Sequence, residues 1–359
     1  KKMKTKRQAW VDYARGIAII LVLYRHVFEG IKYAGISIQE YLPIEYANIM
    51  FYSFRMPLFF IVSGFFVAKS LQKRGLSSFV ATKARTIIYP YFLWGFIQIS
   101  LQLVFSSYVN ADKEQMHYIY LLYSPRQVGQ FWYLYALFNV AVLYVLVKIL
   151  LKVPVWLNVL FGLIMYLISA YIFQHNINVW FLSDIVHYYI FFAIGDWVSF
   201  FINNAPNEKY MKSSKILMLV LFPFLALQAW YLYLNLQHPL PHYDYAEYHL
   251  PILFLLIALV GCTFIILLSN QLEKRNVLQW LRVLGEHSLY IYVAHVVVMA
   301  GLRIFLMHVL HINNLPVLLL SGIISGLIIP VWMYKLAKKA NMEWLFALKE
   351  KKRLKSAIQ

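Results

Sequence analysis

The chain has 359 residues, of which 62% are hydrophobic and only 13% are charged. Soluble domains carry about 25% charged residues, so this composition excludes an ordinary water-soluble fold. The formal charge of +18 would suit a nucleic-acid-binding protein. However, the Lys and Arg residues lie in short connections between apolar runs, and we expect no nucleic-acid partner.

Apolar runs recur along nearly the whole chain. A helix that spans a bilayer needs roughly 20 mostly apolar residues, and only helices or closed barrels satisfy the backbone in lipid. No strand-like alternation competes with helices. We therefore predict an all-α integral membrane protein, a bundle of about ten transmembrane helices that forms one domain over residues 1–359 in the lipid bilayer. The expected helices cover 9–29, 47–69, 86–107, 130–151, 154–173, 183–203, 215–236, 249–269, 285–309 and 315–336.

The connections between these runs alternate in charge. Even-numbered connections and both terminal tails are basic; the second connection, for example, holds Lys73 and Arg74. Odd-numbered connections hold few cations, and residues 237–248 contain neither Lys nor Arg. Cytoplasmic loops are enriched in Lys and Arg, so we expect both tails in the cytoplasm of a cell inner or plasma membrane.

The first run carries charged side chains at a depth where lipid is expected. Such residues are rare and usually mark function. Asp12 and Arg15 lie three residues apart on one helical face, which fits either an interfacial ion pair or a functional pair. Arg15 and His26 are eleven residues, or roughly 16 Å, apart along the axis and share a face. A cation near the cytoplasm and an imidazole further out suit a donor that enters from inside.

The second run is expected to cross from outside to inside. Arg55 then lies at about the depth of His26, beside Pro57, which can kink the helix. Ser63 and Gly64 lie deeper, where small residues allow close approach of a ligand or of a neighbouring helix. Both interpretations of this pair stay open, but helix packing does not explain Arg55.

Five segments resemble the membrane-bound acyltransferase 3 family, which includes surface-polysaccharide O-acetyltransferases. The first runs from Asp12 to His26 and is similar to the family's pattern of a basic residue, ten residues and a histidine. The second resembles its Pro-Leu-Phe-Phe…Ser-Gly-Phe segment. In order, the segments are 12–26, 54–65, 83–91, 131–134 and 284–295, and they extend over most of the chain.

The resemblance implies an O-acyltransferase that passes an acyl group, expected to be acetyl from cytoplasmic acetyl-CoA, to a hydroxyl of an extracytoplasmic glycan. Glycan-synthesis machinery is then an expected partner. By motif match, the resemblance makes His26 catalytic with Arg15 as its partner, and it makes Glu286 and the Ser63–Gly64 pair functional. Glu286 is expected to begin the ninth helix, where it is either a helix N-terminal charge or a site residue.

The expected chemistry requires a base for the acceptor hydroxyl and a cation for the developing oxyanion. Neutral histidine is the natural base near pH 7, so His26 is predicted to be the base or a transient acyl carrier. Candidates for oxyanion or substrate contacts are Arg55, Arg25 and Trp132. Candidates for the CoA site are Arg15, Ser63, Gly64, Lys83 and Arg85, although Lys83 is equally explained by positive-inside anchoring.

A metal site and a transporter are two alternative interpretations of the sequence. His238, His242 and Asp244 lie near prolines without tight ligand spacing, and we expect no metal site. A transporter or flippase for a glycan or small anionic solute would also use intramembrane charges and broken helices. It is the main alternative, although no inverted repeat is found and the charges concentrate in the first three helices.

Overall fold

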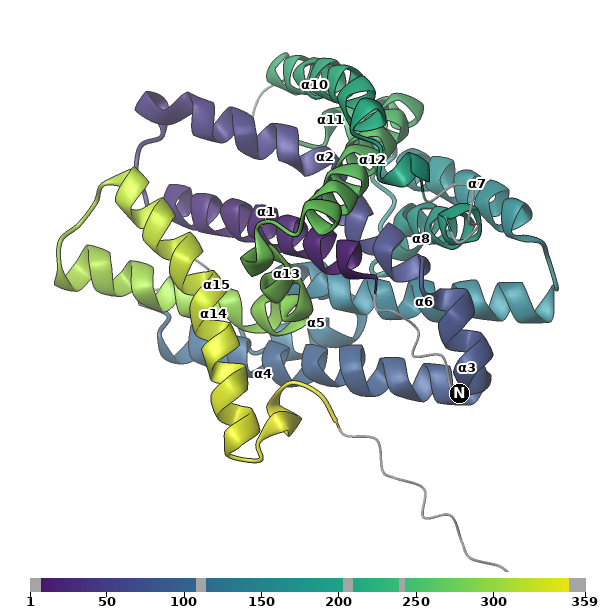
Figure 1. Cartoon of the computed structure of the whole chain (residues 1–359). Coiled ribbons are helices and arrows are strands. Elements are labelled where there is room, and N and C mark those ends of the chain that lie inside the picture. The colour runs from purple at the N-terminus through teal and green to yellow at the C-terminus, as the bar shows by residue number, and fades with distance from the viewer. Residues whose placement is uncertain (1–7, 108–113, 203–208, 239–242, 349–359) are drawn as a thin grey trace, which may run out of the picture.

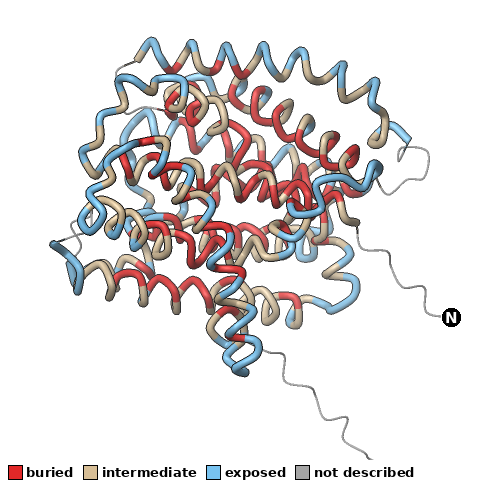
Figure 2. The backbone as a smooth tube through the Cα atoms, turned by 60° about the vertical axis from the view of Figure 1, so that its left-hand side comes forward, coloured by how far each residue is buried: buried red, intermediate tan, exposed pale blue. Residues whose placement is uncertain are grey.

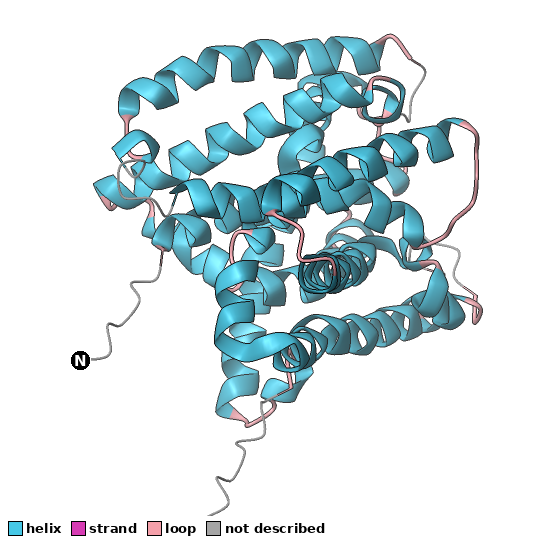
Figure 3. Ribbon diagram, turned by 90° about the vertical axis from the view of Figure 1, so that its right-hand side faces the viewer, coloured by secondary structure: helices cyan, strands magenta, loops and turns pink. Residues whose placement is uncertain are grey.

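A computed structural model describes residues 8–107, 114–202, 209–238 and 243–348. Within these ranges every regular element is a helix (Figure 3). Residues 1–7 and 349–359 of the basic tails lie outside the described residues, and so does His242.

Ten long helical segments correspond to the ten expected runs (Figure 1). They are α1 (Ala9–Tyr33), α2 (Leu42–Gly64), the continuous unit of α3 (Val67–Lys83), η2 (Ala84–Ile88) and α4 (Tyr89–Val104), α6 (Trp132–Leu150), α7 (Val155–Gln174), α8 (Leu182–Ile202), α10 (Ser214–Leu236), α12 (Pro251–Arg275), α14 (Ser288–Ile304) and α15 (Leu315–Lys339). Short helices connect them: η1 (Gln39–Tyr41), α5 (His117–Tyr123), η3 (Pro125–Phe131), α11 (Tyr245–His249), α13 (Gln279–Glu286), η4 (Phe305–Val309) and η5 (Glu343–Leu345).

Eight helical segments in the described part of the chain are long and apolar enough to cross a membrane. The two further expected spans, α1 and α2, are less apolar. Every stretch of 18 residues in α1 holds at least three charged side chains, and Asn48, Ser53 and Arg55 interrupt α2. The predicted all-α, multi-pass membrane fold is confirmed. Of these two less apolar helices, α1 carries Arg15 and His26, and α2 carries Arg55.

Helix α1 lies at the centre of the bundle, where α2, α12, α13, α14 and α15 contact it (Figures 1 and 2). Glycines permit the closest of these contacts. A Cβ at Gly16 would overlap the carbonyl oxygen of Leu281, and one at Gly285 would overlap that of Asp12. The first backbone amides of α1, those of Ala9 and Trp10, donate to the Glu273 carboxylate of α12 at 3.3 and 3.2 Å. This carboxylate caps the helix and complements its dipole.

Helix α10 buries polar side chains and exposes apolar ones, a pattern that is typical of a helix at the edge of a membrane bundle. Its buried side chains are Gln228, Tyr231 and Asn235, whereas Phe222 is 82% exposed. The apolar outer face suits lipid contact. The Tyr231 hydroxyl donates to the backbone carbonyl of Tyr243 at 2.5 Å. The polar inner face therefore anchors the segment that leads into α11.

Candidate active site

A cavity of about 860 Å³ lies beside the C-terminal half of α1. It is called here the His26 cavity. Its lining includes four predicted site residues, His26, Arg25, Arg55 and Trp132, which come from three different elements. Rings from α2, α8 and the segment before α11 complete it, among them Tyr52, Tyr188 and Tyr243. The structure thus brings together the catalytic and acceptor-side residues that sequence analysis had placed at a similar depth.

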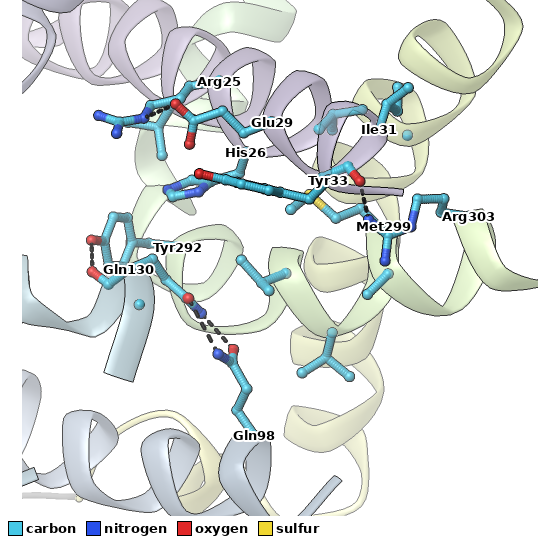
Figure 4. A pocket seen from close by; sticks show the side chains of 18 of the residues that line it. Arg25, His26, Glu29, Ile31, Tyr33, Gln98, Gln130, Tyr292, Met299 and Arg303 are labelled. Carbon is cyan, nitrogen blue, oxygen red and sulfur yellow. Dashed lines mark hydrogen bonds and ion pairs between the residues drawn. The ribbon is translucent and has the colours of Figure 1, made fainter. Parts of the chain in front are cut away.

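His26 points from α1 into this cavity, above Tyr292 and Gln130 (Figure 4). Neither of its ring nitrogens forms a hydrogen bond with a described residue. Its ring centroid lies 5.3 Å from that of His295, which is fully buried. Nδ1 of His295 lies 2.8 Å from the carbonyl oxygen of Tyr292. A carbonyl only accepts, so this nitrogen carries a proton, and in the neutral ring Nε2 holds the lone pair. His26 is left available to a substrate and is backed by an oriented imidazole.

Several charges around the cavity are paired, within α1 or between elements. Arg25 Nε donates to Glu29 at 2.8 Å (Figure 4). Arg126 Nη2 donates to the buried Asp184 of α8 at 2.6 Å, and its guanidinium lies 4.5 Å from the ring centroid of Trp132. These pairs hold two of the lining guanidinium groups in defined positions.

Glu247 of α11 closes one side of the cavity. Its carboxylate accepts a hydrogen bond from the Tyr52 hydroxyl at 2.7 Å and lies 2.9 Å from Nε2 of His187 on α8. Burial would raise the pKa of the Glu247 carboxyl, but His187 and the Tyr52 hydroxyl outweigh it, and the pKa lies below its ordinary value. Glu247 is therefore an anion near neutral pH and ties α11 to α2 and α8.

A second pocket, of about 260 Å³, lies beside the N-terminal half of α1. It is called here the Arg15 pocket. It brings together three of the five residues predicted for the CoA site, Arg15, Ser63 and Lys83, which come from α1, α2 and α3. Thr86 and Ser288 add further hydroxyl groups. No acidic side chain is among its described lining residues.

Tyr292 of α14 lines both the His26 cavity and the Arg15 pocket. Its hydroxyl donates to the backbone carbonyl of Gln130 (Figure 4), and its ring packs 5.2 Å from that of Tyr133. The Gln130 side chain pairs in turn with Gln98 through two hydrogen bonds, of 2.6 and 3.3 Å. This wall between the two spaces is built by α4, η3, α6 and α14.

Comparison with known proteins decides the family. A family model described as an acyltransferase domain, acyltransferase 3, matches residues 8–335. The chain belongs to this family. The acyltransferase is also 24% identical over 149 residues to the nodulation protein NolL of Mesorhizobium japonicum. That match covers 41% of the acyltransferase and 37% of the relative, so it spans well under half of either protein. No solved structure matches the chain significantly.

Three predicted residues of the acyltransferase line neither space. Gly64 packs on α8, where a Cβ would overlap the carbonyl oxygen of Phe192, which fits the helix-packing interpretation. Arg85 lies in η2, between the pocket residues Lys83 and Thr86. The expectation that Glu286 begins the ninth helix is wrong. Glu286 ends α13, where it lies 3.4 Å from Arg282, and α14 begins at Ser288.

The structure also adds residues that sequence analysis did not select. Glu29, Gln130, Tyr292 and Glu247 line the His26 cavity, and His295 lies behind it. His295 and Tyr292 belong to the segment 284–295 that resembles the family, which was the available signal. Of the residues weighed for a metal site, His238 stacks on Tyr245, with ring centroids 3.3 Å apart.

Proposed function

We propose that this membrane acyltransferase moves an acetyl group from cytoplasmic acetyl-CoA to a hydroxyl of an extracytoplasmic glycan. One observation carries the proposal: two spaces of different chemistry lie along α1, and they share Tyr292. A reaction between a donor and an acceptor on opposite sides of a membrane needs such an arrangement. In the proposed orientation, the N-terminus of α1 faces the cytoplasm.

The Arg15 pocket is the proposed donor site. Arg15 and Lys83 supply positive charge, and Ser63, Thr86 and Ser288 supply hydroxyl donors. Phosphate groups are bound by such sets of cations and donors. The pocket is too small for all of CoA, so the proposal places there the phosphate end of the pantetheine arm, against Arg15 and Lys83. Arg85, on the same helical segment as Lys83 and Thr86, is a candidate contact for the remaining phosphates of the nucleotide.

The His26 cavity is the proposed acceptor site. His26 removes the proton of the acceptor hydroxyl, and the oxygen attacks the thioester carbonyl. The carbon–sulfur bond breaks, and the CoA thiolate takes the proton back from His26. Arg25 and Arg55 are the proposed cations for the developing oxyanion or the substrate. Because His295 lies directly behind His26, it is proposed as a positioning residue.

An acetyl-His26 intermediate would divide the same transfer into two steps. His26 would then attack the thioester first, and the CoA thiolate would leave and take the ring proton. In the second step the acceptor hydroxyl would displace the imidazole, which takes up the hydroxyl proton. Rapid quenching of the enzyme with labelled acetyl-CoA in the absence of glycan distinguishes the two routes. Only the two-step route leaves label on the protein.

The proposed function is tested with labelled acetyl-CoA and surface glycans in proteoliposomes. We expect His26→Ala and His26→Gln to lower transfer by about 10²–10⁴-fold, the usual contribution of a positioned base. His175→Ala, which changes an exposed histidine at the end of α7, is the matched control. Near-normal transfer by folded His26→Ala would remove His26 from the mechanism. Failure to bind any acyl-CoA would instead favour transport.

A further inference from the structure

Arg55 differs from the other arginines near His26. Its side chain is 2% exposed, and it forms no ion pair with a described residue. Nη1 makes two long hydrogen bonds, of 3.4 Å to the carbonyl oxygen of Leu21 and 3.5 Å to Asn48. Nη2 has no hydrogen-bond partner among the described residues.

The acidic side chains that line the cavity form no ion pair with Arg55. Glu29 accepts from Arg25, and Glu247 is held between Tyr52 and His187. Asp244, the third acidic lining residue, also lies outside ion-pair distance of Arg55. The face of Tyr52 lies 5.5 Å from the guanidinium carbons of both Arg25 and Arg55. The ring therefore stabilises Arg55 without neutralising its charge.

A buried cation without a counter-ion is costly. Removing an ion from water costs several kcal/mol in real proteins, and a protein normally recovers this through a paired charge. Such residues in membrane proteins are expensive and mark ligand or ion sites. Because Arg55 lines the His26 cavity, a ligand in that cavity is placed to supply the missing anion.

A second arginine that forms no ion pair with a described residue lies further along the cavity. Arg303 of α14 also lines the cavity, donates to the backbone carbonyl of Gly30, and forms no ion pair with a described residue (Figure 4). Arg303 lies near the C-terminal end of α1, whereas Arg55 lies close to His26. The two guanidinium groups thus offer positive charge at two separate points of one cavity.

We infer that the acceptor is an acidic glycan, and that Arg55 binds an anionic group of the sugar residue whose hydroxyl is presented to His26. The anion is a carboxylate or a phosphate, since a guanidinium binds either through paired hydrogen bonds. Arg303 contacts a further anionic group at the end of the cavity beside Gly30. This inference rests on the proposed function, because it assumes that the His26 cavity is the acceptor site.

The test measures acceptor binding by the full chain in nanodiscs, without acetyl-CoA. The probes are a neutral oligosaccharide, a uronic-acid oligosaccharide of equal length, and its phosphorylated neutral counterpart. We expect the wild type to bind one or both acidic probes about 10- to 100-fold more tightly than the neutral probe, the effect of one hydrogen-bonded charge pair. Tight binding of only the phosphorylated probe would assign the anion to a phosphate, and of only the uronate to a carboxylate.

Two substitutions decide the role of Arg55. Arg55→Gln should abolish most of the preference for acidic probes, whereas Arg55→Lys, which keeps the charge, should retain part of it. Arg275→Gln, at the exposed end of α12, is the control cation change. Gel filtration establishes that each variant is folded.

The inference is overturned if the wild type binds neutral and acidic probes equally, or if folded Arg55→Gln keeps the full preference. Acetyl transfer is measured separately. Transfer to neutral glycans without any acidic preference would reject the inference and leave the proposed function standing. Acidic binding that depends on Arg55, without transfer to any glycan, would support the inference and count against the proposed function.

Discussion

The His26 cavity and the Arg15 pocket lie along the same helix, yet their linings differ in size and in charge. The cavity holds about 860 Å³ and combines four arginines with acidic side chains and aromatic rings. The pocket holds about 260 Å³ and combines two cations with hydroxyl groups. The larger space can orient a ligand that both donates and accepts hydrogen bonds, as sugars do, whereas the smaller one favours an anion.

The two spaces also differ in the contacts that hold their lining residues in place. In the His26 cavity, charged side chains are held by contacts between elements, such as Arg126 with Asp184 and Glu247 with His187. The residues of the Arg15 pocket come from α1, α2, α3, η2, α6 and α14, and its cations face hydroxyl groups and apolar side chains. Substitution of Arg126 or Glu247 therefore also releases the partner of the changed residue.

Among the variants that compare the two spaces, the largest effect is expected on the use of the acyl donor. We expect Arg15→Gln to lower kcat/KM for acetyl-CoA by about 10- to 100-fold, because a charged hydrogen bond is lost, and Arg15→Lys to lower it less. Arg126→Gln should instead raise KM for the glycan, since it releases Asp184 and the face of Trp132. Steady-state kinetics with each substrate varied in turn would show this contrast. Equal effects of both variants on both substrates would contradict two separate sites.

The next effect concerns the wall between the two spaces. Tyr292→Ala removes the hydrogen bond to Gln130 and the ring contact with Tyr133. We expect transfer to glycan to fall about 10-fold, because misplacement of reacting groups by about 1 Å can cost up to 10²-fold. Release of free acetate should rise, since water gains access to the thioester. Tyr292→Phe keeps the ring and is the matched control; unchanged acetate release in Tyr292→Ala would show that Tyr292 does not separate the spaces.

A smaller effect is expected for the two adjacent residues at the end of α2. Gly64→Ala places a methyl group against the backbone of Phe192, and we expect it to lower stability by about 1–3 kcal/mol without selective loss of donor affinity. Ser63→Ala, which changes a lining residue of the Arg15 pocket, should weaken acetyl-CoA binding with little loss of stability. Thermal unfolding and acetyl-CoA titration of both variants would separate packing from binding. The opposite pattern would exchange their roles.

The smallest effect is a pH dependence at the His26 cavity. The pKa of Glu247 is lower in the folded protein than in the unfolded chain, so its stabilising contribution is present above the unfolded pKa. This contribution is lost as the pH falls through the folded pKa. Thermal unfolding of Glu247→Gln should therefore depend less on pH across the acidic range than that of the wild type. Parallel pH curves for the two proteins would show that Glu247 does not contribute.

Local pattern was sufficient to predict the spanning helices and to select several of the residues that line the two spaces. Runs of about 20 apolar residues have few alternatives in lipid, and the spacing of Arg15 and His26 on one helix follows from helical geometry alone. The short helix α13 was not predicted, because it lies between two apolar runs and shows no spanning length. Because α13 is present, Glu286 lies at the end of this short helix and not at the start of the ninth spanning helix.

The partners of the site residues depend on tertiary arrangement. Asp184 and His187 lie on α8, far in sequence from Arg126 and Glu247, and no local pattern indicates which charges will pair. The arginines of the cavity that form ion pairs could therefore be distinguished from those that do not only in the folded structure. The sequence did indicate that Arg55 needed an explanation other than helix packing.

The contacts at the start of α1 have a consequence for biosynthesis. The amides of Ala9 and Trp10 can form these hydrogen bonds only after Glu273 has been synthesised, 264 and 263 residues further along the chain. At about 5–20 residues per second, this separation corresponds to roughly 13–53 s of translation. Helix α1, which carries Arg15 and His26, is therefore synthesised well before the residue that caps it. A ribosome that stalls before α12 would leave the first amides of α1 without the Glu273 carboxylate.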